Sequence, residues 1–245
     1  MIRIEKIDVV GWEHAIRGMR NAMNSWAKSD SCECIEEWNS NICQRCNIKD
    51  CGYCIGDNDL NLMKKLGNAG SDHGKYLRMI TVYMDITAPL YWWKEFDTYK
   101  VGTVANSCST MHKIHAKEFT LDDFSCEHLD DEWDSEDDCG YKHSNSIVFY
   151  NDEYGNTPTD ILEFLIEALN HYRKMFLETK DKKYWWYMIQ LLPSSYNQKR
   201  TVQLNYQVLK NMYHARKNHK LDEWHKFCEM IEELPYSELI TGKEG

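Results

Sequence analysis

Three polar residues near the C-terminal end of the sequence have side chains suited to holding a heterocyclic ring. Asn205, Asn211 and Arg216 stand among apolar residues in the segment 201–218, which the spacing predicts as a helix. At about 100° per residue, the eleven steps from Asn205 to Arg216 bring these two side chains within roughly 20° of each other, and Asn211 projects to another side. Asparagine amides donate to and accept from the edge of a flavin or pyrimidine ring, and a guanidinium stabilises negative charge on a ring carbonyl. Helix capping and surface pairing are the alternative roles of these residues.

The cysteines form a second candidate site. Six of the ten fall within residues 32–54. Four of these make two C-x-x-C pairs: Cys43, Cys46, Cys51 and Cys54. One tight turn in each pair can present two thiolates to a tetrahedral ion, so zinc is the expected metal. An iron–sulfur cluster and free or redox-active thiols are the alternatives, and Cys32 and Cys34 can replace one of the pairs.

Other catalytic patterns in the sequence are weaker. His112 and His115 lie one helical turn apart, but the sequence shows no third metal ligand for them. The Ser107-Cys108-Ser109 segment lacks the G-x-S-x-G elbow, and the sequence contains neither a P-loop nor a G-x-G-x-x-G motif. The pairs Trp92-Trp93 and Trp185-Trp186 are predicted to be core residues.

The segment around Asn205 resembles the flavin-dependent thymidylate synthase family. In that family a Leu-Pro pair precedes a helix whose Asn-x5-Asn-x4-Arg pattern contacts flavin and deoxyuridine monophosphate. Here Leu192-Pro193 precedes Asn205, Asn211 and Arg216 at the same spacing. The resemblance therefore implies that these three polar residues contact a flavin and a nucleotide.

The resemblance extends upstream of this helix. The family's Gly-His-x-Ser-x-x-Glu-His segment falls on residues 72–79 and retains His73, and the strand and Ala-Pro helix that follow resemble residues 80–100. The family's arginine-rich signature then begins at Thr98. Four residues of this chain are similar in type to signature positions: Lys100, Thr103, Asn106 and Ser109.

Three arginines of the family pattern are replaced in this chain. Their positions hold Thr98, Met111 and Ile189. In the family these arginines bind flavin and nucleotide phosphates, and lysine does not reproduce their bidentate fork. Three lysines on the same loop and its flanks can rebuild a phosphate site: Lys94, Lys100 and Lys113.

The resemblance implies a function and an assembly. It implies a mixed α/β single domain with a helical C-terminal half, in a homotetramer whose active sites combine chains. Reduced FAD would serve methyl transfer from methylene-folate to dUMP without an enzyme nucleophile, and Arg216 would be the catalytic residue that polarises the uracil ring. The implied cofactor-binding residues are His73, Lys100, Thr103, Ser109, Asn205 and Asn211. The implied substrate-binding residues are Lys94, Asn106 and Arg216.

The sequence leaves open two alternatives to this enzyme. The first is a catalytically inactive nucleotide- or flavin-binding protein on the same scaffold, which the three missing arginines favour. The second is an interaction protein stabilised by zinc at the cysteine cluster. The retained Asn205, Asn211 and Arg216 favour both the enzyme and the inactive binding protein over this second alternative.

Periodicity predicts the elements that must position these residues. Strands are expected at residues 2–10 and 77–87. Helices are expected at residues 12–28, 58–68, 158–180, 182–192, 201–218 and 221–233, and one more helix is expected to start at Pro89. The small and polar residues 102–110 are expected to form a loop that can approach a ligand closely.

Composition limits the class of protein. The 245 residues carry 29 basic and 39 acidic side chains, for a net charge of −10 and a pI near 5.5, which argues against nucleic-acid and membrane-surface partners. One domain over 1–245 is expected, with a Cys-rich insertion at 32–56 and an acidic loop at 121–145. No signal peptide or membrane span is apparent, so a cytoplasmic location is expected.

Overall fold

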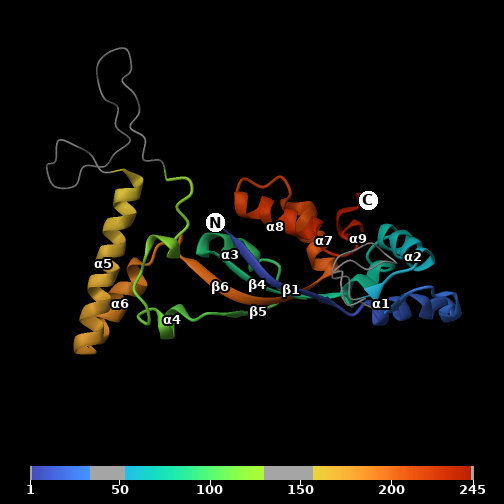
Figure 1. Ribbon diagram of the computed structural model, residues 1–245, viewed down its shortest axis with the longest axis horizontal. Coiled ribbons are helices and arrows are strands. Elements are labelled where there is room, and N and C mark those ends of the chain that lie inside the picture. Colours follow the sequence, from blue (N-terminus) through green and yellow to red (C-terminus); the bar gives the residue numbers. More distant parts are fainter. Residues whose placement is uncertain (1, 34–52, 130–156, 244–245) are drawn as a thin grey trace, which may run out of the picture. The chain divides into compact units, whose positions relative to one another are not determined.

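The computed structural model of the chain describes residues 2–33, 53–129 and 157–243, and Figure 1 labels its helices and strands. The chain divides into two compact units. Unit 1 comprises chiefly Ala88–Tyr91 and Cys108–Gln198. Unit 2 comprises Ile2–Thr87, Trp92–Ser107 and Lys199–Gly245. Most of the candidate site residues belong to unit 2.

A four-stranded sheet, in the order β1-β4-β6-β5, forms the centre of the fold. Its strands are β1 (Arg3–Val10), β4 (Thr81–Pro89), β6 (Asn197–Asn205) and β5 (Val104–Ser107). The pairs β1–β4 and β5–β6 are antiparallel. Apolar side chains alternate along the two central strands, because successive residues of a strand point to opposite faces. The buried ones are Val82, Met84, Ile86 and Ala88 on β4 and Val202 and Leu204 on β6.

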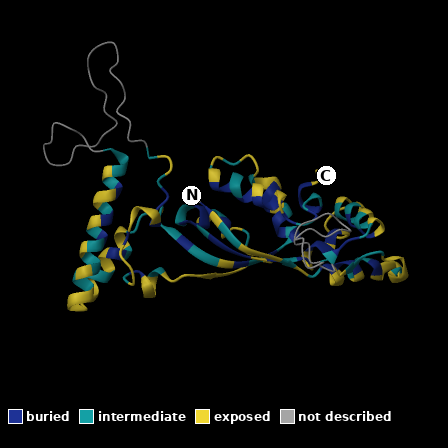
Figure 2. Cartoon of the chain, in the orientation of Figure 1, coloured by how far each residue is buried: buried dark blue, intermediate teal, exposed yellow. Residues whose placement is uncertain are grey.

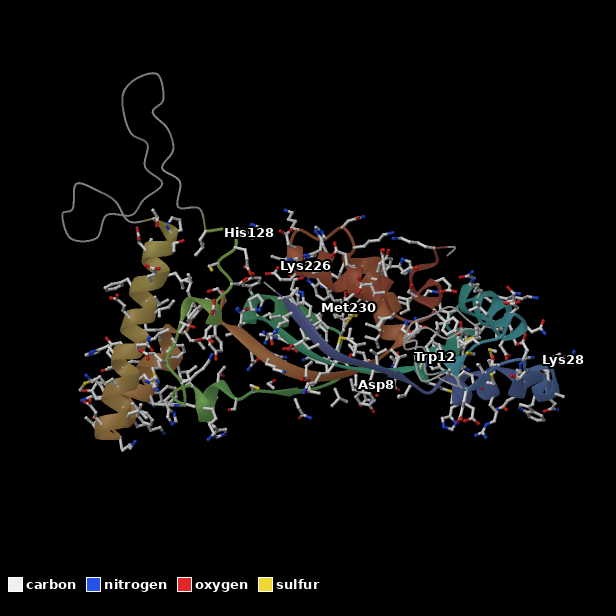
Figure 3. All side chains as sticks on the ribbon, in the orientation of Figure 1. Asp8, Trp12, Lys28, His128, Lys226 and Met230 are labelled. Carbon is white, nitrogen blue, oxygen red and sulfur yellow. The ribbon has the colours of Figure 1, made fainter. Side chains whose placement is uncertain are left out.

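Helices of unit 2 pack around this sheet and against one another. They are α1 (Trp12–Arg20), α2 (Asp57–Asn68), α3 (Leu90–Phe96, which begins in unit 1), α7 (Tyr206–Arg216), α8 (Asp222–Glu232) and α9 (Glu238–Thr241), with the short 3-10 helix η3 (Gly74–Arg78). The helix η3 contacts α1, α2 and α7. Trp12, labelled in Figure 3, lies edge-on to the rings of Tyr206 and Tyr236 and joins α1 to the C-terminal helices.

An aromatic cluster joins α3 to α8 in unit 2. Trp92 contacts the rings of Phe96, Trp224 and Phe227, and all four side chains are at most 1% exposed. Aromatic side chains of this size bury 150–250 Å² each. The cluster therefore gives α3 a fixed position against α8, and α3 carries Lys94 and Glu95.

Unit 1 is built on a helical hairpin. It contains α4 (Thr110–Lys113), α5 (Pro158–Thr179) and α6 (Lys182–Leu191), with α5 packed against α6. Their buried stripes face a small core, which is dark blue in Figure 2. That core consists of Ile114, Phe119, Phe124, Leu162, Ile166, Leu169 and Met188.

Several predicted elements are confirmed. The strand at 2–10 is β1, the helix at 58–68 is α2, and the helices at 158–180, 182–192 and 221–233 are α5, α6 and α8. The helix expected at 12–28 ends earlier, at Arg20, and two 3-10 turns follow it: η1 (Asn21–Met23) and η2 (Trp26–Lys28). The helix expected from Pro89 begins at Leu90, since Pro89 is the last residue of β4.

Two predictions about the site segments are wrong. The helix predicted over 201–218 is a strand up to Asn205 and a helix from Tyr206, because Val202 and Leu204 alternate into the core. The angle of about 20° between Asn205 and Arg216 therefore does not apply. The loop predicted over 102–110 contains β5, whose exposed residues pair with β6 through the backbone.

The prediction that Trp186 is a core residue is also wrong, because this side chain is 44% exposed.

The two expected insertions lie largely outside the described residues. Of the predicted metal ligands, Cys43, Cys46 and Cys51 lie there, and Cys54 is buried on the short strand β3 (Tyr53–Cys54), opposite Cys32 on β2 (Cys32–Glu33). Of the acidic loop, the described part includes the 3-10 helix η4 (Leu121–Asp123). Among the described residues, no helix is long and apolar enough to span a membrane.

Candidate functional site

The helix α7 carries the three residues that the sequence singled out. Asn205 is the N-cap of α7, Asn211 lies in its middle and Arg216 is its last residue. At a rise of 1.5 Å per residue, Asn205 and Arg216 are about 16 Å apart along the helix. One small ring cannot reach both side chains. The two ends of α7 are therefore two separate candidate subsites.

The first subsite is built at the N-terminus of α7. The Asn205 side-chain oxygen accepts a hydrogen bond from the Val208 backbone N–H at 3.0 Å, which is the capping role that the sequence left open. Because the oxygen is engaged in the cap, the Nδ2 amide of Asn205 remains as a donor. This amide has no hydrogen-bond partner among the described residues.

A close approach of the backbone brings the segment before β5 to this subsite. Gly102 has a φ of +79°, and a Cβ built there would lie only 2.9 Å from Asn205 Nδ2. Glycine is needed at such a position both for its backbone angle and for its lack of a side chain. The structure thus brings Gly102 and the neighbouring Thr103 to Asn205.

Thr103 adds an unsatisfied polar group. Its hydroxyl is buried and has no hydrogen-bond partner within the described part of the chain. Leaving a buried hydroxyl unpaired costs about 1–3 kcal/mol, so such a group suits a ligand that hydrogen-bonds to it. The Thr103 hydroxyl and the Asn205 amide are therefore two candidate hydrogen-bonding groups for the polar edge of a ring such as a flavin. Lys100, three residues earlier, and Asn106 on β5 are both exposed.

His73 lies on a segment that packs against α7 near its first turn. It precedes η3, which packs against α7, and a Cβ built at the adjacent Gly74 would lie 3.8 Å from Gln207 Oε1. Gln207 in turn donates from its amide to Asn211 Oδ1 at 3.1 Å. The structure therefore places the segment that carries His73 near the Gln207–Asn211 pair. Sequence reasoning missed Gln207, although its position four residues before Asn211 was a usable signal.

The second subsite, at the C-terminus of α7, is a cluster around Arg216. Arg216 Nη1 lies 2.7 Å from a carboxylate oxygen of Glu95, and Arg216 Nε donates to the Tyr99 hydroxyl at 3.0 Å. The guanidinium carbon lies 5.6 Å from the Tyr99 ring centre and 5.0 Å from that of Trp224. The surface-pairing role left open for Arg216 is therefore present. Sequence reasoning missed Glu95, Tyr99 and Trp224, which reach Arg216 only through tertiary packing.

The buried tyrosines of α7 are poor candidates for proton transfer. Burial raises the pKa of Tyr206 well above its ordinary value, and its hydroxyl donates to the Pro235 carbonyl at 2.5 Å. Burial and the hydrogen bond to Glu232 raise the pKa of Tyr213. Both hydroxyls are already used in packing contacts of α7.

The remaining candidate residues are placed differently. Lys94 is exposed on α3 in unit 2. Ser109 belongs to unit 1, where its hydroxyl accepts from the His112 backbone N–H at 3.0 Å and caps α4, and Lys113 belongs to the same unit. Among the described residues, no group of three or more His, Cys, Asp or Glu side chains is arranged to hold a metal ion.

Comparison with known proteins identifies the fold. Thymidylate synthase X from Helicobacter pylori, solved with FAD and dUMP, matches with a TM-score of 0.60 at 15% identity, over 98% of this chain and 97% of that chain. The chain has the fold of flavin-dependent thymidylate synthase. A UMP/dUMP methylase, PolB from Streptomyces cacaoi bound with 5-Br UMP, matches with a TM-score of 0.56 at 12% identity, over 99% of this chain and 95% of that chain. No family model matches the sequence, and no curated protein does either.

Proposed function

We propose that the chain is a flavin-dependent enzyme that methylates the pyrimidine ring of a uridine nucleotide such as dUMP, with methylene-folate as the methyl source. The observation that carries the proposal is the pair of subsites on α7. One end offers an amide and an unsatisfied hydroxyl, and the other offers a guanidinium held by aromatic rings. The thymidylate synthase fold and the bound ligands of the two similar structures support the same assignment.

The residues of this chain have separate roles in the proposed reaction. Asn205 Nδ2 and the Thr103 hydroxyl hydrogen-bond to the flavin ring edge, and His73 and Asn211 bind beside them. A bound flavin supplies the reducing equivalents that convert a transferred methylene group to a methyl group. Arg216 stabilises negative charge on a carbonyl of the uracil ring as it develops. Removing one donor of this kind costs about 3–4 kcal/mol of transition-state stabilisation.

Phosphate binding in this proposal is assigned to lysines. Lys100 is exposed two residues before Gly102, Asn106 is exposed on β5 opposite Thr201, and Lys94 is exposed on α3, so their side chains are accessible to an anionic ligand. Ser109 and Lys113 belong to unit 1, and their part in phosphate binding stays a prediction from the sequence. Replacement of arginine by lysine removes the bidentate fork, so we expect weaker and less directional phosphate binding than in the family.

Flavin titration and turnover test the proposal together. We expect purified protein to bind FAD at micromolar concentration, with a changed flavin absorbance spectrum. We also expect it to convert dUMP or UMP when reduced flavin and methylene-folate are present. Arg216→Ala should abolish conversion and leave FAD affinity within about threefold, whereas the matched variant of the next cation, Lys217→Ala, should behave as wild type. Absence of FAD binding by the wild type would rule out the enzyme.

A catalytically inactive binding protein is the second candidate. The observation that favours it is the replacement of three family arginines by Thr98, Met111 and Ile189. It predicts FAD or nucleotide binding with no turnover by either wild type or Arg216→Ala. The homotetramer and the zinc site are tested separately, by light scattering and by elemental analysis, and a zinc-loaded protein without flavin binding would favour the interaction protein.

A further inference from the structure

One carboxylate oxygen lies within hydrogen-bonding distance of three side chains at the C-terminal end of α7. Oε2 of Glu95, on α3, lies 2.7 Å from Arg216 Nη1, 3.1 Å from His219 Nε2 and 3.3 Å from Trp224 Nε1. The three partners come from the end of α7, the turn after it, and α8. Hydrogen bonds to an ionised carboxylate are roughly twice as strong as neutral ones. Glu95 therefore fixes the position of the guanidinium more firmly than Tyr99 alone would.

The free donors of Arg216 follow from these contacts. Nε is taken by the Tyr99 hydroxyl and Nη1 by Glu95. One hydrogen of Nη1 and both hydrogens of Nη2 lack a hydrogen-bond partner among the described residues, and the Arg216 side chain is 19% exposed. The negative charge of Glu95 next to the guanidinium repels a phosphate and leaves these free donors to a neutral carbonyl oxygen.

A backbone contact orients the ring of His219. Its Nδ1 accepts a hydrogen bond from the Leu221 backbone N–H at 3.2 Å. The other ring nitrogen, Nε2, faces Glu95 and donates to its carboxylate.

We propose that Glu95 and His219 are positioning residues for Arg216, which hold the guanidinium so that its free N–H donors meet a neutral ring carbonyl of the nucleotide. Glu95 also compensates the positive charge of the guanidinium, so we expect the lysines, and not Arg216, to bind the phosphate of the nucleotide. His219 holds the Glu95 carboxylate in place through Nε2. The identity of the ligand in this inference rests on the proposed function. The contacts of Glu95 with Arg216 and His219, called the clamp below, do not depend on that function.

Kinetic measurements on matched variants test the clamp. Glu95→Gln keeps the shape and removes the charge, and we expect it to lower kcat about 10- to 100-fold with KM for dUMP changed less than threefold, as for other orienting groups. His219→Ala should lower kcat as well. His219→Gln should recover most of it, because the Gln amide can donate from the place of Nε2. Asp97→Asn, which neutralises a carboxylate paired with Arg200 instead, is the control.

A readout in the ligand-free protein separates this inference from the proposed function. Hydrogen exchange of the Arg216 Nη1–H that donates to Glu95, followed by NMR and assigned with Arg216→Lys, should be slow in wild type and Asp97→Asn, and at least tenfold faster in Glu95→Gln. Unchanged exchange in Glu95→Gln would overturn the clamp whatever the activity. Equal kcat in wild type, Glu95→Gln and His219→Ala would overturn its positioning role. Altered exchange in a protein that does not turn over dUMP would support the clamp and refute the enzyme.

Discussion

Asn205 has two functions that can be separated at the level of single atoms. Its oxygen caps α7, and its Nδ2 amide is the proposed flavin donor. Asn205→Asp keeps an acceptor for the cap and loses the donor, so we expect stability within about 0.5 kcal/mol of wild type and weaker FAD binding. Asn205→Ala loses both and should cost about 1 kcal/mol. Urea unfolding and FAD titration measure the two effects, and FAD binding by Asn205→Asp equal to wild type would contradict the donor role.

Cys228 and Cys108 differ in thiol reactivity. Burial, followed by the charges of Glu232 and Glu229, raises the pKa of Cys228 to about 11. At pH 8 only about 0.1% of this thiol is then thiolate, the reactive form. Cys108 is exposed. We expect iodoacetamide at pH 8 to label Cys108 at least a hundredfold faster than Cys228 in the folded protein, and both at similar rates in urea. Peptide mapping measures the two rates, and rapid labelling of folded Cys228 would contradict its burial.

At the scale of elements, the boundary between β6 and α7 shows what the sequence could not resolve. Residues 201–218 satisfy a helical spacing, and within them Val202 and Leu204 also satisfy the alternation of a strand. Only pairing with β5 and burial against the sheet decide for the strand. The sequence therefore predicts candidate site residues, but it does not predict how they lie relative to one another. Glu95 and His219 were not predicted as partners of Arg216 for the same reason. They contact each other and Arg216 only because α3 and the turn after α7 pack together in the fold.

The start of α5, by contrast, was predictable because its signals are local. Thr157 accepts from the Asp160 backbone N–H at 3.2 Å, and the Asp160 carboxylate accepts from the Thr157 N–H at 2.8 Å. We expect Thr157→Ala to destabilise this helix end by about 1 kcal/mol, and Thr157→Ser to preserve it. Amide hydrogen exchange in the first turn of α5 measures the effect. Equal exchange in both variants would show that the capping box does not stabilise α5.

At the scale of the whole molecule, local signals predicted most of the longer helices and, among the strands of the large sheet, β1 and part of β4, but not how these elements assemble. The order β1-β4-β6-β5 places β4 and β6 side by side although more than a hundred residues separate them in the sequence. The division into two compact units likewise depends on contacts between distant residues. Because some neighbouring strands of this sheet are far apart in the sequence, the strand order could be inferred only from the resemblance to a known family.

A buried ion pair ties together the segments that flank the Cys-rich region. Asp59 on α2 is fully buried and accepts hydrogen bonds from Arg20 Nε at 2.6 Å, from the Ser29 and Ser31 hydroxyls at 2.7 Å each, and from the Asp30 N–H at 3.1 Å. Burial acts to raise the pKa of Asp59, but the hydrogen bonds from Ser31, Ser29 and Arg20 outweigh it, so the pKa lies below its ordinary value. The charged form of Asp59 therefore stabilises the folded state.

This shift predicts how stability depends on pH. Because the folded-state pKa of Asp59 is lowered, its contribution is complete above the unfolded pKa of about 3.9 and is lost as pH falls through the lower folded value. Asp59→Asn leaves Arg20 buried without its counterion, so we expect a loss of about 3–5 kcal/mol at pH 7 and a smaller loss of stability on acidification than in wild type. Urea midpoints between pH 7 and pH 3 measure both effects, with the exposed Asp72→Asn as the control. A variant that loses stability on acidification as steeply as wild type would show that other carboxylates cause the acid sensitivity of unit 2.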